Sequence, residues 1–490
     1  MSIYSKKYLI ALLIAAIILI GVLFRTYVYL QNVSFWADES ALILNLMSKT
    51  YLELFKPLDY NQQAPPLFLI FSKMVYQLFG LNEFILRSIP YFSSLISLVL
   101  FYFVCKKFFT HHISILIALL LFALHFRLIN YAQMFKPYSS DVCFSIILLL
   151  LFLGIDFKNI TTKKIALLSV LCILLPWISY SSIFYTIPYC LCMFFYSCIL
   201  KNKKLVKYSS SFLVVNLTGF CIYYFINLYY PANSEYQHQT WGSWYGFLPD
   251  TYARITALFN YIFSVKNEFG LFLTSLILLI GVYKLIKHNK TSAIIILMPI
   301  LATAAAGFFH LYPFADRLIL FLIPNFILIF VSAIEYTNIT KKTYNYPLII
   351  LLFTSYLFIS GVFKYPFEFY TKKSDFDKSS TREYIRWLKD ENVSMNSVVY
   401  FNASDGGYEI YADKFNFKCP EKIFEVWPNI IESMEMLPHN KIVYIHAYNK
   451  YDDPNMVYDY KTKINWINKN CTILKKRELY NRVFIKCHRM

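Results

Sequence analysis

Long apolar runs recur along the first three quarters of the chain. A helix needs about 20 mainly apolar residues to cross the hydrocarbon core of a bilayer. The first run is too long for the core of a signal peptide, and no small-residue cleavage site follows it, so we expect it to be retained. The pattern predicts an all-α polytopic membrane domain with about eleven spans, at residues 8–30, 88–105, 113–130, 141–155, 165–181, 183–200, 208–230, 270–286, 292–309, 317–334 and 346–363.

Lysines around these runs predict the topology. Lys6 and Lys7 precede the first run, which favours a cytoplasmic N-terminus. Residues 65–80 form a shorter run that opens with two prolines. If this run crossed the membrane, every later basic loop, beginning at Lys106, would face outward. We therefore expect a juxtamembrane helix in the outer interface, and residues 31–87 as the first outer loop.

The pattern changes after residue 363. Residues 379–391 are polar with apolar positions at helical spacing, and they are followed by short β-rich runs at 397–401, 441–446 and 482–486. Helix and short strands in alternation predict a small α/β domain. We expect a transmembrane domain over residues 1–363 and an extracytoplasmic α/β domain over residues 364–490.

Charge supports this arrangement. The 490 residues include 47 Lys and Arg against 29 Asp and Glu, a net charge of +18. Residues 364–490 hold 21 basic and 17 acidic residues, so most of the excess belongs to the apolar part. Many of these basic residues fall in loops expected to face inward. The charge thus indicates a multi-pass protein of the plasma membrane, with the lipid bilayer and not nucleic acid as its partner.

Two neighbouring carboxylates, Asp38 and Glu39, lie just past the outer end of the first span. Such pairs are costly to desolvate at a membrane surface and seldom serve packing. We expect one of them to be a catalytic general base, with Asp38 the first candidate and Glu39 its orienting neighbour or the base itself. The pair could also hold a divalent cation, Mg²⁺ or Mn²⁺. The plain alternative is a solvated helix start after Trp36.

Cationic side chains are expected on the same side of the membrane. Lys136 lies at the outer end of the third span, and Arg317 lies at the outer mouth of the tenth, with His310 nearby as a weaker candidate. Such groups can neutralise a phosphate. They can equally be cations that extend from span ends toward water, with Asp316 as the partner of Arg317.

Taken in order, these pieces resemble the polytopic GT-C glycosyltransferases. The nearest resemblance is to the family of protein O-mannosyltransferases and of the transferases that add aminoarabinose to lipid A. It rests on the acidic pair, Ala64-Pro65-Pro66-Leu67-Phe68, residues 80–87, residues 131–138, and Tyr312-Pro313-Phe314 with Arg317. Many relatives have arginine where Lys136 stands, and the lipid A branch often has an acidic-basic pair where Gln63 and Ala64 stand.

The resemblance implies an inverting transferase that uses a polyprenyl-phosphate-linked monosaccharide, with undecaprenyl phosphate as the bacterial carrier. The acceptor is a lipid-linked glycan, a cell-envelope polymer, lipid A or a protein on the outer face. Candidate sugar contacts are Tyr138, Gln63, Trp241, Trp244 and Tyr312; the tryptophans are also typical of an interfacial aromatic belt. Two alternatives stay open. One is a transporter or flippase of lipid-linked glycans, a function for which charged or broken spans would be expected. The other is a catalytically inactive scaffold.

Overall fold

The chain forms two compact units. The computed structural model describes residues 3–156, 160–229, 242, 251–265, 267–336, 353–354, 356, 381–401, 407–424, 429–448, 454–479 and 482–490. The membrane unit comprises Met1–Leu30, Lys49–Gly80 and Phe84–Glu368, and the sheet unit comprises Gln31–Ser48, Leu81–Glu83 and Phe369–Met490. Two pieces of the expected first outer loop therefore belong to the same unit as the C-terminal region.

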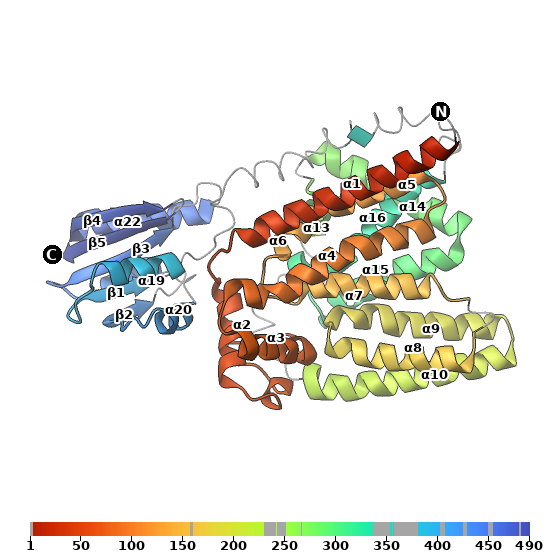
Figure 1. Ribbon diagram of the computed structural model, residues 1–490, viewed down its shortest axis with the longest axis horizontal. Helices are drawn as coiled ribbons and strands as arrows, with labels where there is room; N and C mark the ends of the chain where they lie inside the picture. Colours follow the sequence, from red (N-terminus) through yellow and green to blue (C-terminus); the bar gives the residue numbers. More distant parts are fainter. Residues whose placement is uncertain are drawn as a thin grey trace. The chain divides into compact units, whose positions relative to one another are not determined.

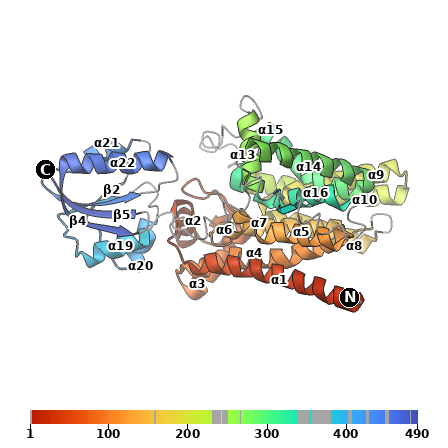
Figure 2. The ribbon, with the colours of Figure 1, turned by 90° about the horizontal axis from the view of Figure 1, so that it is seen from above.

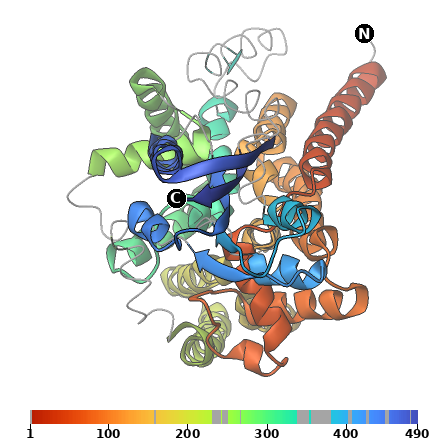
Figure 3. The same cartoon turned by 90° about the vertical axis from the view of Figure 1, so that its left-hand side faces the viewer.

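The membrane unit is a bundle of helices whose axes mostly lie along a common line (Figures 1 and 2). Figure 3 looks roughly along many of these axes. Its helices are α1 (Ile3–Leu30), α3 (Pro66–Phe79), α4 (Glu83–Phe108), α5 (His112–Ala123), α6 (Phe126–Tyr131), α7 (Tyr138–Phe152), α8 (Thr162–Leu174), α9 (Ile183–Ile199), α10 (Lys203–Tyr223), α13 (Thr251–Phe263), α14 (Glu268–His288), α15 (Lys290–Phe308) and α16 (Ile323–Glu335).

Seven helical stretches among the described residues are long and apolar enough to cross a membrane, which confirms an integral membrane protein. They are Lys7–Leu30, Glu83–Phe108, Tyr180–Ile199, Lys203–Leu228, Glu268–His288, Lys290–Phe308 and Asp316–Glu335. The expected spans at 113–130 and 165–181 are shorter helices: α5 stops at Ala123, and α8 gives way to a 3-10 turn, η3 (Leu175–Trp177). Most of the expected span at 346–363 lies outside the described residues.

Both ends of the short helix α5 are closed by buried charged side chains. At its start, Glu335 Oε1 accepts hydrogen bonds from the backbone N–H of Thr110 at 2.7 Å and of His111 at 3.3 Å. At its end, the Arg25 guanidinium donates to the carbonyl oxygens of Ala123 at 2.8 Å and Phe122 at 3.4 Å. An anion at the N-terminus and a cation at the C-terminus complement the helix dipole. These contacts allow α5 to end at Ala123, within the apolar run that was expected to span residues 113–130.

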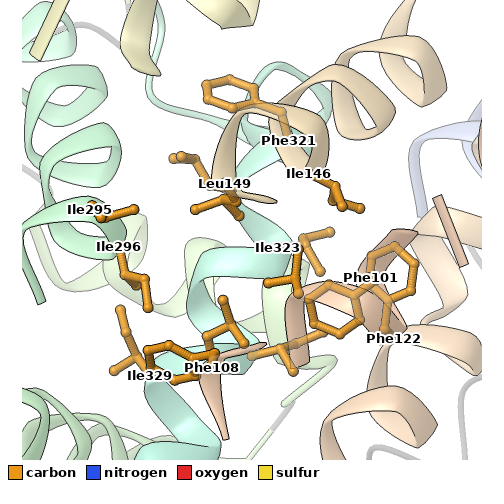
Figure 4. Close-up of a cluster of buried hydrophobic side chains, with 14 of the residues drawn as sticks. Phe101, Phe108, Phe122, Ile146, Leu149, Ile295, Ile296, Phe321, Ile323 and Ile329 are labelled. Atoms are coloured by element: carbon orange, nitrogen blue, oxygen red, sulfur yellow. The ribbon is translucent and has the colours of Figure 1, made fainter. Parts of the chain in front are cut away.

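The core of the membrane unit surrounds α16 and the 3-10 helix η7 (Asp316–Leu322) before it. Side chains from several helices meet there, including Phe101, Phe122, Ile146 and Ile329 (Figure 4). A close helix approach adds to this packing, because a Cβ at Gly281 of α14 would lie 2.1 Å from the Ile329 carbonyl oxygen of α16. Small residues permit such contacts between membrane helices.

The sheet unit contains a five-stranded mixed sheet in the order β2-β1-β3-β5-β4. The strands are β1 (Val398–Phe401), β2 (Glu421–Phe424), β3 (Ile442–Tyr448), β4 (Cys471–Leu479) and β5 (Arg482–Arg489). β1 pairs in parallel with β2 and β3, whereas β5 pairs antiparallel with β3 and β4. The expected α/β region is thus confirmed, and the three predicted strands correspond to β1, β3 and β5.

Helices cover both faces of this sheet. α21 (Ile430–Glu435) and α22 (Pro454–Asn470) lie on one side, and α19 (Thr381–Asp390) and α20 (Tyr408–Lys414) on the other (Figure 2). Alternation along the strands separates the two cores: Val398 and Tyr400 pack with Ile467, whereas Phe401 packs against Tyr384. The same unit also holds α2 (Ala37–Ser48), which carries the candidate carboxylates.

Candidate functional site

Asp38 and Glu39 occupy the first turn of α2 and have different surroundings. Glu39 is 1% exposed, and its Oε2 accepts the backbone N–H of Trp36, the residue before the helix, at 3.2 Å. This is the acidic half of a capping box, in which the third helical residue reaches back to the N-cap amide. Asp38 is half-buried. The local structure gives Glu39 a role in starting the helix.

A metal site at this pair would need more ligands than the two carboxylates. In the described parts of the chain, no three His, Cys, Asp or Glu side chains gather in a way that could hold a metal ion. One oxygen of Glu39 is already bonded to a backbone amide. Mg²⁺ usually binds one or two carboxylates and completes its six ligands with water and substrate phosphate, so a divalent cation at this pair stays a prediction.

Lys136 lies in the membrane unit, in the turn between α6 and α7. Its side chain is buried at 4% exposure, and Nζ donates a hydrogen bond to Gln62 Oε1 at 2.6 Å. Gln62 comes from the segment before α3, 74 positions earlier in the chain. The contact joins the two motifs of the membrane unit that the sequence singled out, the Pro-Pro segment and the third-span motif.

Further contacts hold the start of α3 in place. The Tyr180 hydroxyl donates to the carbonyl oxygen of Ala64 at 2.8 Å, and the rings of Phe68 and Phe135 stack with centroids 5.8 Å apart. Pro65 caps α3 and Pro66 occupies its first position, where a missing N–H costs nothing. The sequence predicted this helix at residues 65–80, and the structure has it at Pro66–Phe79.

The start of η7 and the segment before it carry the remaining charged candidates. Arg317 is half-buried and Asp316 is exposed in the first turn of η7. Both act on Tyr131 at the end of α6: burial raises the pKa of the Tyr131 hydroxyl, Asp316 raises it further, and Arg317 lowers it. Tyr131 lies five positions before Lys136, so the charge of Arg317 acts on the segment that carries that lysine. His310 is exposed with a left-handed backbone, φ 59°.

The candidate sugar contacts have varied surroundings. Tyr138 begins α7, and its half-buried ring meets Tyr131 edge to face with centroids 5.3 Å apart. The Tyr312 hydroxyl donates to the carbonyl oxygen of Leu318 at 2.8 Å, so it serves the turn before η7. Gln63 is half-buried beside Gln62. Trp241 and Trp244 lie outside the described residues.

The structure thus brings Lys136 and Gln62 together within the membrane unit, and Arg317 of the same unit acts electrostatically on Tyr131. Asp38 and Glu39 belong to the sheet unit, so their meeting with these cations stays a prediction. Sequence reasoning named Gln63 but missed its neighbour Gln62, and it missed Tyr180. Their partners, Lys136 and Ala64, lie 74 and 116 positions away in the chain, so no local pattern links them.

Comparison with known proteins gives a likeness of fold. The sequence matches no family model and no curated protein. The structure is similar to the crystal structure of ArnT from Cupriavidus metallidurans in the apo state, with a TM-score of 0.53 and 10% identity over 98% of each chain. It is also similar to that protein bound to undecaprenyl phosphate, with a TM-score of 0.51 and 11% identity over 98% of each chain. The predicted GT-C type fold is confirmed.

Proposed function

We propose that this chain is a GT-C membrane glycosyltransferase that moves a monosaccharide from a polyprenyl-phosphate carrier to an acceptor on the outer face of the membrane. The observation that carries the proposal is the fold, which is similar over 98% of the chain to an ArnT structure bound to undecaprenyl phosphate. The buried Lys136 and the acidic start of α2 supply residue types that such a reaction needs.

The proposed reaction is a single displacement at the anomeric carbon. A hydroxyl or amine of the acceptor attacks that carbon, the bond to the phosphate oxygen breaks, and polyprenyl phosphate leaves with the bonding electron pair. Asp38 takes the proton of the attacking group. This displacement inverts the configuration of the sugar.

The local geometry favours Asp38 over Glu39 as the base. Glu39 is buried, and its Oε2 accepts the Trp36 N–H, so it stabilises the beginning of α2. Asp38 precedes it by one position on the same turn and is half-buried. A general base must lie within hydrogen-bond reach of the proton that it takes, so the half-buried Asp38 is a better candidate than the carboxylate that caps the helix.

Lys136 is the proposed partner of the lipid phosphate, with Arg317 as a second cation. A phosphate group would take the place of the Gln62 amide oxygen at Lys136 Nζ, exchanging a neutral acceptor for a charged one. Charge-assisted hydrogen bonds are roughly twice as strong as neutral ones. A lysine binds as a point charge, so arginine at this position should also serve.

The test uses the full-length protein in vesicles with undecaprenyl-phosphate-linked monosaccharides, a panel of labelled sugars, and a cell-envelope extract as the source of acceptor. Asp38→Asn should lower transfer at least about 100-fold, in the range of general-base catalysis, while undecaprenyl phosphate still binds. Glu39→Gln is the matched control, because its amide oxygen can still accept the Trp36 N–H. It should retain transfer within about tenfold of the unmodified protein.

The phosphate role has its own readout in the same preparation. Lys136→Ala should weaken undecaprenyl phosphate binding about tenfold or more, and Lys136→Arg should retain most of it. Lys73→Ala removes another buried lysine of the membrane unit, one that faces the Tyr51 ring, and should leave binding unchanged. Full transfer by Asp38→Asn, or equal binding by all three lysine variants, would overturn the corresponding role; no transfer from any donor would overturn the function.

A further inference from the structure

The segment that carries the candidate base belongs to the same compact unit as the C-terminal α/β region. We call Gln31–Ser48 the α2 segment; it follows α1 directly in the chain. The expected domain division would leave this segment with the membrane helices. Its contacts within the sheet unit show instead what holds it.

A buried carboxylate lies at the centre of these contacts. Glu83 is 2% exposed, and each of its oxygens pairs with a different cation of the α/β region. Arg382 Nη1 of α19 lies 3.0 Å from Oε1, and Lys414 Nζ of α20 lies 2.8 Å from Oε2. A buried carboxylate with both oxygens paired is satisfied. Loss of one partner leaves buried charge uncompensated and lowers the stability of the fold.

Arg382 extends this cluster to the α2 segment. Its Nη2 donates to the carbonyl oxygen of Asn32 at 2.7 Å, while its Nε donates to Glu383. Asn32 has a left-handed backbone, φ 45°, a conformation that asparagine adopts more readily than most residues. Burial alone would lower the pKa of Arg382, but Glu383 and Glu83 raise it above its usual range.

Two further hydrogen bonds fix the next residues of the segment. Ser34 Oγ donates to Glu383 Oε2 at 2.7 Å, and the Phe35 backbone N–H donates to the Tyr411 hydroxyl at 2.7 Å. The rings of Phe35 and Tyr411 stack with centroids 6.1 Å apart. Three of the four residues from Asn32 to Phe35 thus bond to α19 or α20.

The helix α2 itself meets the same region. A Cβ added at Gly407, which directly precedes α20, would lie 3.0 Å from Ser40 Oγ. Ser40 is fully buried one turn into α2 and follows the acidic pair directly. The backbone on both sides of Asp38 is therefore held, by hydrogen bonds before it and by close packing after it.

We propose that Glu83, Arg382 and Lys414 are positioning residues: through them the C-terminal α/β region fixes the backbone that enters α2 and so orients Asp38. The inference rests on the proposed function for its catalytic half. Catalytic groups must be held within about 0.5 Å of their productive position. The α/β region thereby contributes to the chemical step without touching substrate.

The experiment compares Arg382→Gln with Arg386→Gln in the full-length protein. Arg386 lies on the same helix, is exposed, and contacts the Phe415 ring, so it matches the residue type without the bonds to Glu83 and Asn32. Arg382→Gln should speed hydrogen exchange of amides 32–40 at least tenfold and lower kcat about tenfold, with undecaprenyl phosphate affinity unchanged. Arg386→Gln should change none of these.

Two further variants separate positioning from general destabilisation. Tyr411→Phe removes one hydroxyl, and should speed exchange at Phe35 while the strands exchange as before. Arg382→Lys keeps the charge but not the fork, so its kcat should fall between those of the unmodified protein and Arg382→Gln. This graded recovery is not expected from a purely structural role.

Each outcome decides a part of the proposal. If exchange at residues 32–40 is the same in Arg382→Gln and Arg386→Gln, the positioning role is overturned, whatever the protein transfers. If exchange rises and kcat stays constant, the link to catalysis is overturned. If the unmodified protein transfers no sugar, the proposed function fails and with it the catalytic half, while the exchange data still judge the mechanical half.

Discussion

Arg25 in the membrane unit and Arg382 in the sheet unit both have little exposure to water, and their charges are compensated in different ways. Arg25 in the membrane unit is fully buried and bonds to Ser94 and to carbonyl oxygens of Gly21, Ala123 and Phe122. Arg382 in the sheet unit is 12% exposed and bonds to two carboxylates and one carbonyl oxygen.

The difference shows what each environment demands of a cation. Two of the carbonyls that Arg25 meets, those of Phe122 and Ala123, end helix α5, where the dipole concentrates partial negative charge. Backbone carbonyls of this kind stabilise a guanidinium through partial charges that the helix already carries. Near water, Arg382 can use full charges, and its planar fork lets it join segments far apart in sequence.

The largest effect on stability is expected from Arg25→Met. The methionine fills similar space but leaves the last carbonyls of α5 without a donor, at a cost of about 2–4 kcal/mol from unsatisfied buried groups. Unfolding of the full-length protein in detergent measures this loss. Because the site is buried, the loss should be the same in low salt and in 1 M NaCl. A loss below about 1 kcal/mol would show that other groups cap α5.

Arg382→Gln should cost less, about 1–3 kcal/mol, because charged hydrogen bonds are lost while Glu83 keeps Lys414. A double-mutant cycle with Glu83→Gln measures the coupling of the pair. The cluster is partly exposed, so this coupling should shrink as salt rises, unlike the Arg25 effect. A salt-independent coupling would erase the contrast between the two arginines.

The sequence predicted the parts of the fold that apolar pattern controls. β1, β3 and β5 were expected because they are short β-rich runs, whereas β2 and β4 were missed: Lys422, Lys475 and Lys476 give these edge strands a charged sequence. Charged edges discourage pairing with other chains, and they hide a strand from a hydrophobic pattern. The break after α5 was missed because its cause, Arg25, lies 98 positions away from Ala123.

The candidate site also contains residues that the sequence predicted and residues that it did not. Motif order indicated Asp38, Lys136 and the helix at α3, because their residue types carry the chemistry. Glu83 was not predicted as a site residue, and its partner Arg382 lies 299 positions further along the chain. No local pattern links two such residues. Only folding places the α2 segment and the α/β region in one unit.

The smallest effect on stability is expected from substitution of Glu391, which directly follows α19. Its pH dependence tests whether charge pairing in the sheet unit is pH-sensitive. Glu391 pairs with Lys475 and Lys486 from the last two strands. The hydrogen bond from Lys475 lowers the pKa of Glu391, and although burial opposes this change, Lys486 adds to the lowering. A carboxyl group with a lowered pKa in the folded state stabilises the protein above its unfolded pKa of about 4.3, and loses that contribution as pH falls through the folded value.

Glu391→Gln should therefore reduce stability at pH 7 and flatten its decline below about pH 4.3. Hydrogen exchange of the β4 and β5 amides in the full-length protein, measured against pH, reads this locally. Lys475→Gln is the partner variant, and should move the same profile in the same direction. Exchange at Ala123 and Leu124, beside Arg25, should show no such dependence on Glu391, since dipoles of the backbone do not titrate. If the Glu391 variant and the unmodified protein gave the same profile, the exposed side of the sheet unit would be held by packing, as the membrane unit is.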